Sequence, residues 1–217
     1  SATKPITLLL NPGSTWTLSA ASIILQNGST IDGGGAMCRE AGRCATIQRT
    51  TGTTTMISAT GAAGNHVRGF ALRSFYVDGG GTAGHGIVLD YVDRFTLEGV
   101  GVQNGGASNA LRLLNEAWDY SVVNSAFGLW GNATNYTVDL VGLNGASQIT
   151  DGHWFGGQMG EVGNGNPVLR SNGFVLQQRF VDVKFHTTGG TMTHLVDWSG
   201  YRSDFIGSTF QADTASA

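Results

Sequence analysis

Apolar residues along this chain fall into short alternating runs that repeat about every 25 residues. The run at 70–77 (FALRSFYV) returns at 95–102 (FTLEGVGV) and again at 120–127 (YSVVNSAF). Further copies are aligned on Thr150, Phe180 and Phe205, and two of the spacings lengthen to 28 and 30 residues, which indicates loop insertions. A repeat of this length that recurs along most of a chain is the sequence signature of a solenoid.

Within each unit the apolar positions alternate with period two, which predicts β-strand. The alternation slips once in each unit, which predicts a bend after which side chains again point inward. A second apolar strand precedes the units, at 87–89, 111–113, 138–140 and 174–176. The sequence therefore predicts an all-β fold: a right-handed, single-stranded parallel β-helix of about eight coils with about three short strands each.

Stacking the units predicts which side chains become neighbours. The predicted inward column consists of Leu72, Leu97, Val122, Thr150, Phe180 and Phe205. On the outside, Arg73 stacks on Glu98 and Arg112 on Asp139, and opposite charges at stacked positions favour this register. A two-sheet sandwich would have hairpin turns every 8–12 residues and would not produce this repeat.

The repeat organises the whole chain as one domain, 1–217. We expect residues 1–35 to supply an N-terminal cap and the first coils, and 156–172 to form the longest loop insertion. Only 12% of the residues are charged, against about 25% in an average soluble domain, and 34 are glycine. This composition is typical of an all-β protein with many turns.

Charge and hydropathy exclude several classes of function. The net charge is −3 and the basic residues are scattered, so we expect no nucleic-acid partner. The apolar run at 6–10 is too short to span a bilayer, and no segment has the pattern of a signal peptide. Cys38 and Cys44 lack metal-ligand spacing, so they form either a local disulfide or two free thiols. We expect neither a metal nor a cofactor.

The opening segment carries a family resemblance. The order ITLLLNPGSTWTL at 6–18, then a second strand, then the glycine-rich turn IDGGG at 31–35, resembles the first coils of the pectate-lyase-like β-helix superfamily. The turn phrase recurs as VDGGG at 77–81. Proteins with this pattern include polysaccharide lyases, glycoside hydrolases and bacteriophage tailspikes or tail fibres. The low charge and the richness in Gly, Asn and Thr are most similar to the phage members.

This resemblance implies a phage tail appendage domain that recognises, and in some members depolymerises, bacterial surface polysaccharide. It implies a homotrimer on the virion tail, without membrane insertion. Two alternatives remain open: a secreted or periplasmic polysaccharide lyase or glycoside hydrolase, and a non-catalytic structural or adhesin β-helix. The sequence does not decide whether the chain is an enzyme. The Gly-His-Gly element at 84–86 matches polygalacturonases, but the acidic motifs of that family are absent.

Three acids in the turns of neighbouring coils are the candidate catalytic residues: Asp93, Glu116 and Asp119. Rungs about 4.8 Å apart would bring two of these carboxylates to the roughly 5–9 Å separation that glycosidic cleavage uses. The competing interpretation is that acids in solvated turns cap strand ends and maintain solubility.

Four aromatic residues are the candidate carbohydrate-binding residues: Tyr76, Trp118, Trp130 and Trp154. The repeat alignment places Trp154 in the outward column of Tyr76, so we expect its ring to be exposed beside the 156–172 insertion. The same alignment turns His153 inward, as a core histidine. An exposed aromatic ring favours stacking on a sugar, or equally burial against a neighbouring subunit.

Overall fold

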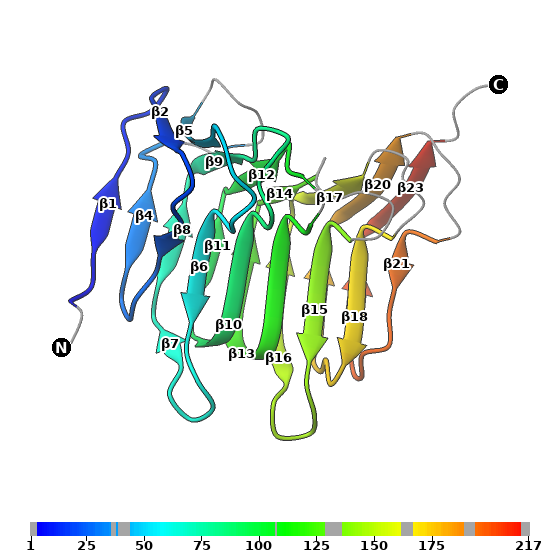
Figure 1. Cartoon of the computed structure of the whole chain (residues 1–217). Helices are drawn as coiled ribbons and strands as arrows, with labels where there is room; N and C mark the ends of the chain where they lie inside the picture. Colours follow the sequence, from blue (N-terminus) through cyan, green and yellow to red (C-terminus); the bar gives the residue numbers. More distant parts are fainter. Residues whose placement is uncertain are drawn as a thin grey trace.

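The structure is a computed structural model that describes residues 4–35, 38, 44–106, 108–128, 136–161, 167–188 and 194–213. All regular secondary structure in these residues is β-strand, and every strand pairing between coils is parallel. No described segment forms an apolar helix long enough to cross a membrane. The strands line three faces of one solenoid, which run side by side from the N-terminal to the C-terminal end (Figure 1).

Face 1 consists of β1 (Thr7–Leu9), β4 (Thr30–Asp32), β8 (Ala71–Arg73), β11 (Thr96–Glu98), the second part of β13 (Leu111–Val123), the second part of β16 (Ile149–Phe155), β19 (Gln178–Val181) and β22 (Asp204–Ile206). Face 2 consists of β2 (Thr15–Leu18), β5 (Ala45–Arg49), β9 (Phe75–Asp78), β12 (Gly101–Gln103), β14 (Ala126–Phe127), β17 (Gln158–Glu161), β20 (Lys184–Thr188) and β23 (Thr209–Asp213).

Face 3 consists of β3 (Ile23–Ile24), β6 (Ile57–Thr60), the first part of β10 (Ile87–Asp93), the first part of β13, β15 (Val138–Gly142), β18 (Leu169–Gly173) and β21 (Val196–Asp197). The short β7 (Val67–Arg68) pairs with the end of β10 at the corner that leads to face 1. Face 2 has eight strands in the described part of the chain, and the roughly seven turns that connect them confirm the right-handed parallel β-helix that the repeat predicts.

Left-handed residues make the corners. Between faces 1 and 2 the corner residues with positive φ include Ser74, Gly99, Asn124, Gly156, Asp182 and Gly207. Between faces 3 and 1 they include Gly69, Arg94, Asp119, Asp151, Gln177 and Arg202, and Tyr91, Asn115 and Gly173 are second left-handed residues in three of these corners. One such residue reverses the alternation, so both flanking strands turn their apolar side chains inward. Gly, Asn and Asp adopt this conformation at least cost, which explains their abundance here.

The inward column of face 1 confirms the predicted stack except in one coil. Leu72, Leu97 and Val122 pair in register, and Phe180 pairs with Phe205. The residue between Val122 and Phe180 is Trp154, not Thr150. Trp154 is 1% exposed, so the prediction of an exposed ring is wrong.

The register error has a physical cause. Aligning this coil on Thr150 places its break in period-two alternation after face 1. In the structure the break is at Asp151, a left-handed residue in the corner before face 1. His153 is consequently exposed rather than inward, because it alternates with the buried Trp154. Similarly, the face 3 strand of this region is β18, and 174–176 lie in the following corner.

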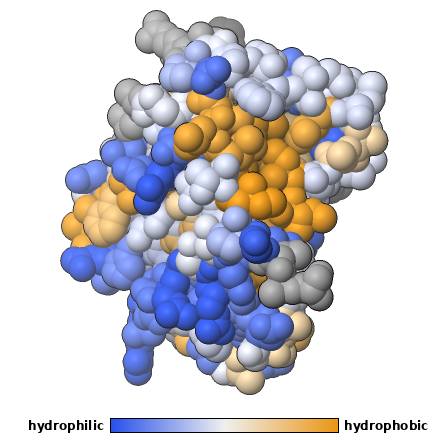
Figure 2. All heavy atoms as spheres, turned by 90° about the vertical axis from the view of Figure 1, so that its left-hand side faces the viewer, coloured by the Kyte–Doolittle hydropathy of each residue, from blue (hydrophilic) through white to orange (hydrophobic). Residues whose placement is uncertain are grey.

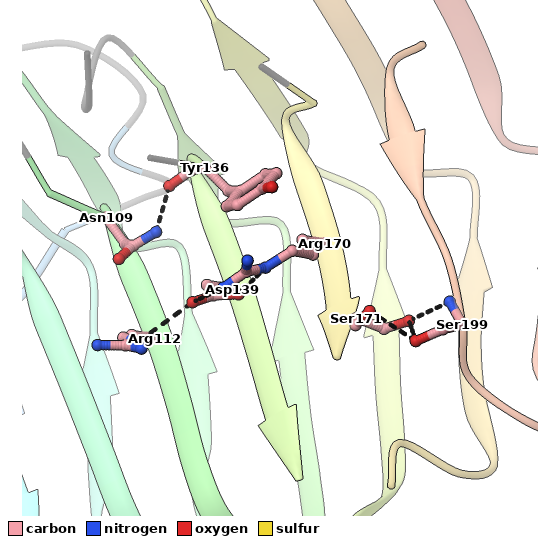
Figure 3. Close-up of polar contacts among 7 residues, drawn as sticks. All are labelled: Asn109, Arg112, Tyr136, Asp139, Arg170, Ser171 and Ser199. Carbon is pink, nitrogen blue, oxygen red and sulfur yellow. Dashed lines mark hydrogen bonds and ion pairs between the residues drawn. The ribbon is translucent and has the colours of Figure 1, made fainter. Parts of the chain in front are cut away.

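Both predicted charge pairs form on the outside of the solenoid. Arg73 Nε lies 3.6 Å from Glu98 Oε2, and Arg112 Nε lies 3.2 Å from Asp139 Oδ2. Arg170 adds a second ion pair to Asp139 from the next rung, at 2.8 Å (Figure 3). These contacts confirm the register of faces 1 and 3 in these coils.

The predicted end and loop segments are placed as follows. Parts of 1–35 form β1 to β4 in the first coils, and an apolar surface lies at this end of the solenoid (Figure 2). A hollow of about 100 Å³ opens there, lined by aliphatic side chains that include Ile6, Leu8 and Ile23. Within 156–172, β17 and the start of β18 are strand, and 162–166 lie outside the described residues.

Candidate functional site

Two of the three predicted acids lie on either side of one histidine. His66 belongs to the turn before β7, Asp93 ends β10, and Glu116 lies within β13. Nε2 of His66 is 2.5 Å from Glu116 Oε2, and Nδ1 is 3.4 Å from Asp93 Oδ2. The stacking of successive corners thus brings together residues that are far apart in the sequence. We refer to His66, Asp93 and Glu116 as the acid–histidine cluster.

The acid–histidine cluster is buried and bound by further groups. Ser147 donates a hydrogen bond to Glu116 Oε1 (2.9 Å). Arg68 and Arg94 lie 3.4 and 3.1 Å from the Asp93 carboxylate. The exposed fractions of His66, Asp93 and Glu116 are only 3%, 7% and 4%. The two carboxylates therefore already have partners and lie out of reach of a sugar ring.

Trp118 covers this cluster, whereas Asp119 does not belong to it. The edge of the Trp118 ring packs on His66 with centroids 4.6 Å apart, and its indole N–H donates to the backbone oxygen of Gln148 (3.0 Å). Trp118 remains 36% exposed. Asp119 is an exposed corner residue. Nothing in the sequence pattern singled out His66, since its partners lie on other coils.

The other predicted aromatic residues do not form a surface platform. Tyr76 is 5% exposed and packs against the Cys38–Cys44 disulfide, which settles the open question about these two cysteines. Its hydroxyl donates to Gln103 Oε1 (3.1 Å). Burial, with a smaller contribution from Asp78, raises the pKa of Tyr76 to about 12. Trp154 is in the core, and Trp130 lies outside the described residues.

An open groove lies elsewhere, on the outer side of face 1 over the last three rungs. Its volume is about 290 Å³, and its lining residues are Asp151, His153, Gln177, Gln178, Arg179, Arg202 and Asp204. These residues come from β16, β19, β22 and the corners before them. His153, Arg179 and Asp204 stack as one outward column.

Three charged side chains of this groove, Arg179, Arg202 and Asp204, are available to a ligand. Among the described residues, no ion pair or side-chain hydrogen bond engages the guanidinium groups of Arg179 and Arg202 or the carboxylate of Asp204. A guanidinium offers up to five N–H donors in a fixed geometry, and a carboxylate only accepts. The groove therefore offers both kinds of hydrogen-bonding group within a few rungs.

An apolar column runs beside these polar side chains. Val123, Phe155, Val181 and Ile206 are paired in register and point outward. Phe155 and Ile206 are 41% and 43% exposed, and the Phe155 ring lies parallel to that of His153 with centroids 6.1 Å apart. The polar groove is thus followed, two residues further along each strand, by an exposed apolar column.

A second hollow of about 270 Å³ adjoins the groove. Leu176, Gln177, Tyr201 and Arg202 line it, and Gln177 and Arg202 line both hollows. Within the described part of the chain, no group of three or more His, Cys, Asp or Glu side chains is arranged to hold a metal ion.

Comparisons with known proteins identify a fold relationship. No protein-family model and no curated protein matches the sequence. A solved structure of ORF18 from Geobacillus virus E2 is similar, with a TM-score of 0.70 and 12% identity over 94% of the present chain. The present chain spans 44% of that viral protein. The parallel β-helix is therefore shared with a phage protein.

Weaker matches are the A-modules of two mannuronan C-5 epimerases from Azotobacter vinelandii. AlgE4 matches with a TM-score of 0.34 at 12% identity, over 98% of the present chain and 89% of its own. AlgE6 matches with a TM-score of 0.36 at 11% identity, over 98% and 88%.

Proposed function

We propose that this chain is a glycan-binding β-helix of a phage tail appendage, and that the groove on the last three rungs of face 1 holds the glycan. The observation that carries the proposal is that Arg179, Arg202 and Asp204, which have no partner among the described residues, line a groove beside the exposed Phe155. Sugars present hydroxyl groups that both donate and accept, together with apolar C–H faces. A groove with guanidinium and carboxylate groups beside an aromatic ring complements both properties.

The phage setting rests on independent support. The low charge and the glycine-rich turns resemble phage members of the superfamily, and the fold is similar to that of a viral protein. A location on the virion tail and assembly as a homotrimer belong to the same proposal. Light scattering on the purified chain measures the number of subunits directly.

The proposed activity is binding without cleavage. Asp93 and Glu116, two of the predicted catalytic acids, are buried. Both contact His66, and Asp93 also contacts Arg68 and Arg94. A reacting acid has to come within hydrogen-bond distance of the glycosidic oxygen, and these carboxylates face protein groups instead. A secreted lyase or hydrolase would need an accessible acid or base, which this buried cluster does not supply. The groove does contain exposed Asp151, His153 and Asp204, so release of reducing ends has to be measured together with binding.

A glycan array tests the proposal, with both binding and release of reducing ends measured. Replacing Arg179→Ala or Asp204→Asn should weaken binding about tenfold each, since each removes charge-assisted hydrogen bonds to the ligand. Arg73→Ala is the matched control, because Arg73 is an exposed arginine of face 1 outside the groove.

Two results would contradict the proposal. If no bacterial polysaccharide binds the intact chain, or if the groove variants bind as the wild type does, the groove is not the glycan site. Release of reducing ends by the wild-type chain would restore the enzymatic alternative.

A further inference from the structure

The second hollow differs in chemistry from the groove that it adjoins. Its two residues that do not line the groove are apolar or aromatic, Leu176 and Tyr201. The two lie on neighbouring coils and are held together by backbone pairing, in which Gln177 N–H donates to Tyr201 O (2.9 Å). The hollow is therefore built into the corner before face 1 in the last two coils.

Polar groups lie at the boundary between the second hollow and the groove. Gln177 and Arg202 line both of them. The side-chain oxygen of Gln177 accepts a hydrogen bond from Thr150 Oγ1 (3.2 Å). The same hydroxyl also lies 3.2 Å from Asp151 Oδ2 and has a single hydrogen for the two acceptors. The Gln177 NH₂ group and the Arg202 guanidinium are the hydrogen-bond donors at the boundary. A carbonyl oxygen at this place would accept from both.

A plain sugar hydroxyl is a poor occupant of the apolar hollow. A hydroxyl gains no partner from Leu176. If its oxygen accepts from Gln177 or Arg202 instead, the apolar surface of Leu176 and Tyr201 stays without an apolar contact. A group that combines a carbonyl oxygen with a methyl group suits the site better. Its oxygen meets the donors of Gln177 and Arg202, and its methyl group packs on Leu176 and the Tyr201 ring.

We propose that this hollow binds the acetyl group of an N- or O-acetylated sugar whose ring lies in the adjoining groove. The inference rests on the proposed glycan-binding function and specifies its ligand class. The methyl contact and one hydrogen bond to the carbonyl together favour an acetylated over a non-acetylated glycan by about tenfold or more.

Matched pairs of glycans test the inference. N-acetylglucosamine oligomers are compared with glucose oligomers of the same length, and bacterial polysaccharides that bind on the array are compared before and after alkaline removal of O-acetyl groups. We expect at least one of these comparisons to show an affinity about tenfold higher for the acetylated member.

Variants separate the hollow from the groove. Tyr201→Ser and Leu176→Ser should remove the preference for the acetylated member while leaving binding of the non-acetylated one within about twofold. Tyr201 is 60% exposed, so its replacement leaves the core intact. Phe174→Ala is the control, since Phe174 is a similarly exposed aromatic residue that does not line the hollow.

The outcomes distinguish the two proposals. If glycans bind in the groove but acetylation makes no difference, or if the variants retain the preference, the acetyl site is wrong and the proposed function stands. If no glycan binds at all, both proposals are wrong.

Discussion

The hydroxyl of Tyr120 donates a hydrogen bond to Gln178 Oε1 (2.5 Å), inside the core and across the coil that lies between them. In that coil the same column holds Gly152, which pairs with both Tyr120 and Gln178. The Trp154 indole N–H also donates to Gln178 Oε1 (3.2 Å), and Gln178 Nε2 donates to the backbone oxygen of Leu176 (2.9 Å). Both the oxygen and the NH₂ group of the buried Gln178 amide therefore have hydrogen-bond partners.

This arrangement predicts that Gly152→Ala destabilises the protein. A Cβ atom at this position would lie 2.1 Å from Gln178 Oε1 and 2.5 Å from Tyr120 Oη, so the hydrogen-bonded pair would have to separate. We expect a loss of about 1–3 kcal/mol in the free energy of unfolding, measured by urea denaturation. Gly145→Ala is the control, because its nearest contact would be Phe174 Cε1 at 3.7 Å. Equal stability of the two variants would contradict this account.

The two confirmed charge pairs should differ in strength. Asp139 is 2% exposed and forms ion pairs with Arg112 and Arg170 (Figure 3). The guanidinium of Arg170 also lies 4.1 Å from the Tyr136 ring centroid. Asp139→Ala leaves two guanidinium groups without their acceptor, so we expect a loss of about 3 kcal/mol. Glu98→Ala breaks an exposed pair and should cost less than about 1 kcal/mol. Chemical denaturation of both variants measures the difference.

His85 provides a prediction about pH. Burial, and next the positive charge of Arg112, lower the pKa of His85 from its ordinary value of 6.5, against an opposing effect of Asp139. Its Nδ1 accepts the backbone N–H of Asn109 (3.2 Å), which favours the neutral imidazole. Below pH 6.5 the unfolded chain takes up a proton that the folded chain does not, so this group reduces stability as the pH falls from 6.5 to the folded-state pKa.

NMR titration of the imidazole measures this directly. The midpoint of His85 should lie below 6.5 in the wild type and move upward in Arg112→Gln, since the neighbouring positive charge is removed. Arg94→Gln serves as the control, because Arg94 is not among the charges that act on His85. A midpoint above 6.5 in the wild type would show that burial does not govern this group.

Replacing Glu116 separates a structural role from a catalytic one. Glu116→Ala leaves the His66 imidazole and the Ser147 hydroxyl without their acceptor, so we expect a loss of about 2–3 kcal/mol in the free energy of unfolding. Glycan binding at low temperature should stay within twofold of the wild type, because the groove lies on other coils.

Asp119→Asn is the matched control for Glu116→Ala, since Asp119 is exposed and Asn tolerates its left-handed conformation. It should change neither stability nor binding. If the wild type cleaved a polysaccharide and Glu116→Gln abolished the cleavage without loss of stability, the acid–histidine cluster would be an active site after all.

The sequence predicted the inward column well in coils with a regular repeat and failed where the repeat is interrupted. Thr150 and Trp154 differ by four positions, so period-two alternation places either one inward with equal ease. Both corners of a coil also contain left-handed residues and reverse the alternation in the same way, as Asp151 and Gly156 do. The pattern alone could not tell which corner it had found.

The candidate sites show the same limit. Asp93 and Glu116 were predicted to approach each other because they belong to adjacent rungs, but His66, which lies between them, comes from another coil. Trp118 packs on His66, two arginines lie against Asp93, and no local pattern encodes those contacts. The groove was missed for a related reason, because its polar residues fall in three separate segments, 151–153, 177–179 and 202–204, and only the stacking of the coils brings these together.

What the sequence by itself determined is the solenoid, because inward apolar positions, glycine-rich turns and the 25-residue spacing are local properties of each coil. Only the tertiary structure decided how coils of unequal length align. That alignment buries Trp154, turns His153 outward and brings Gln177 beside Tyr201 and Arg202. The physical reason is that stacking of rungs depends on the lengths of the corners and loops between strands, and strand periodicity carries no information about those lengths.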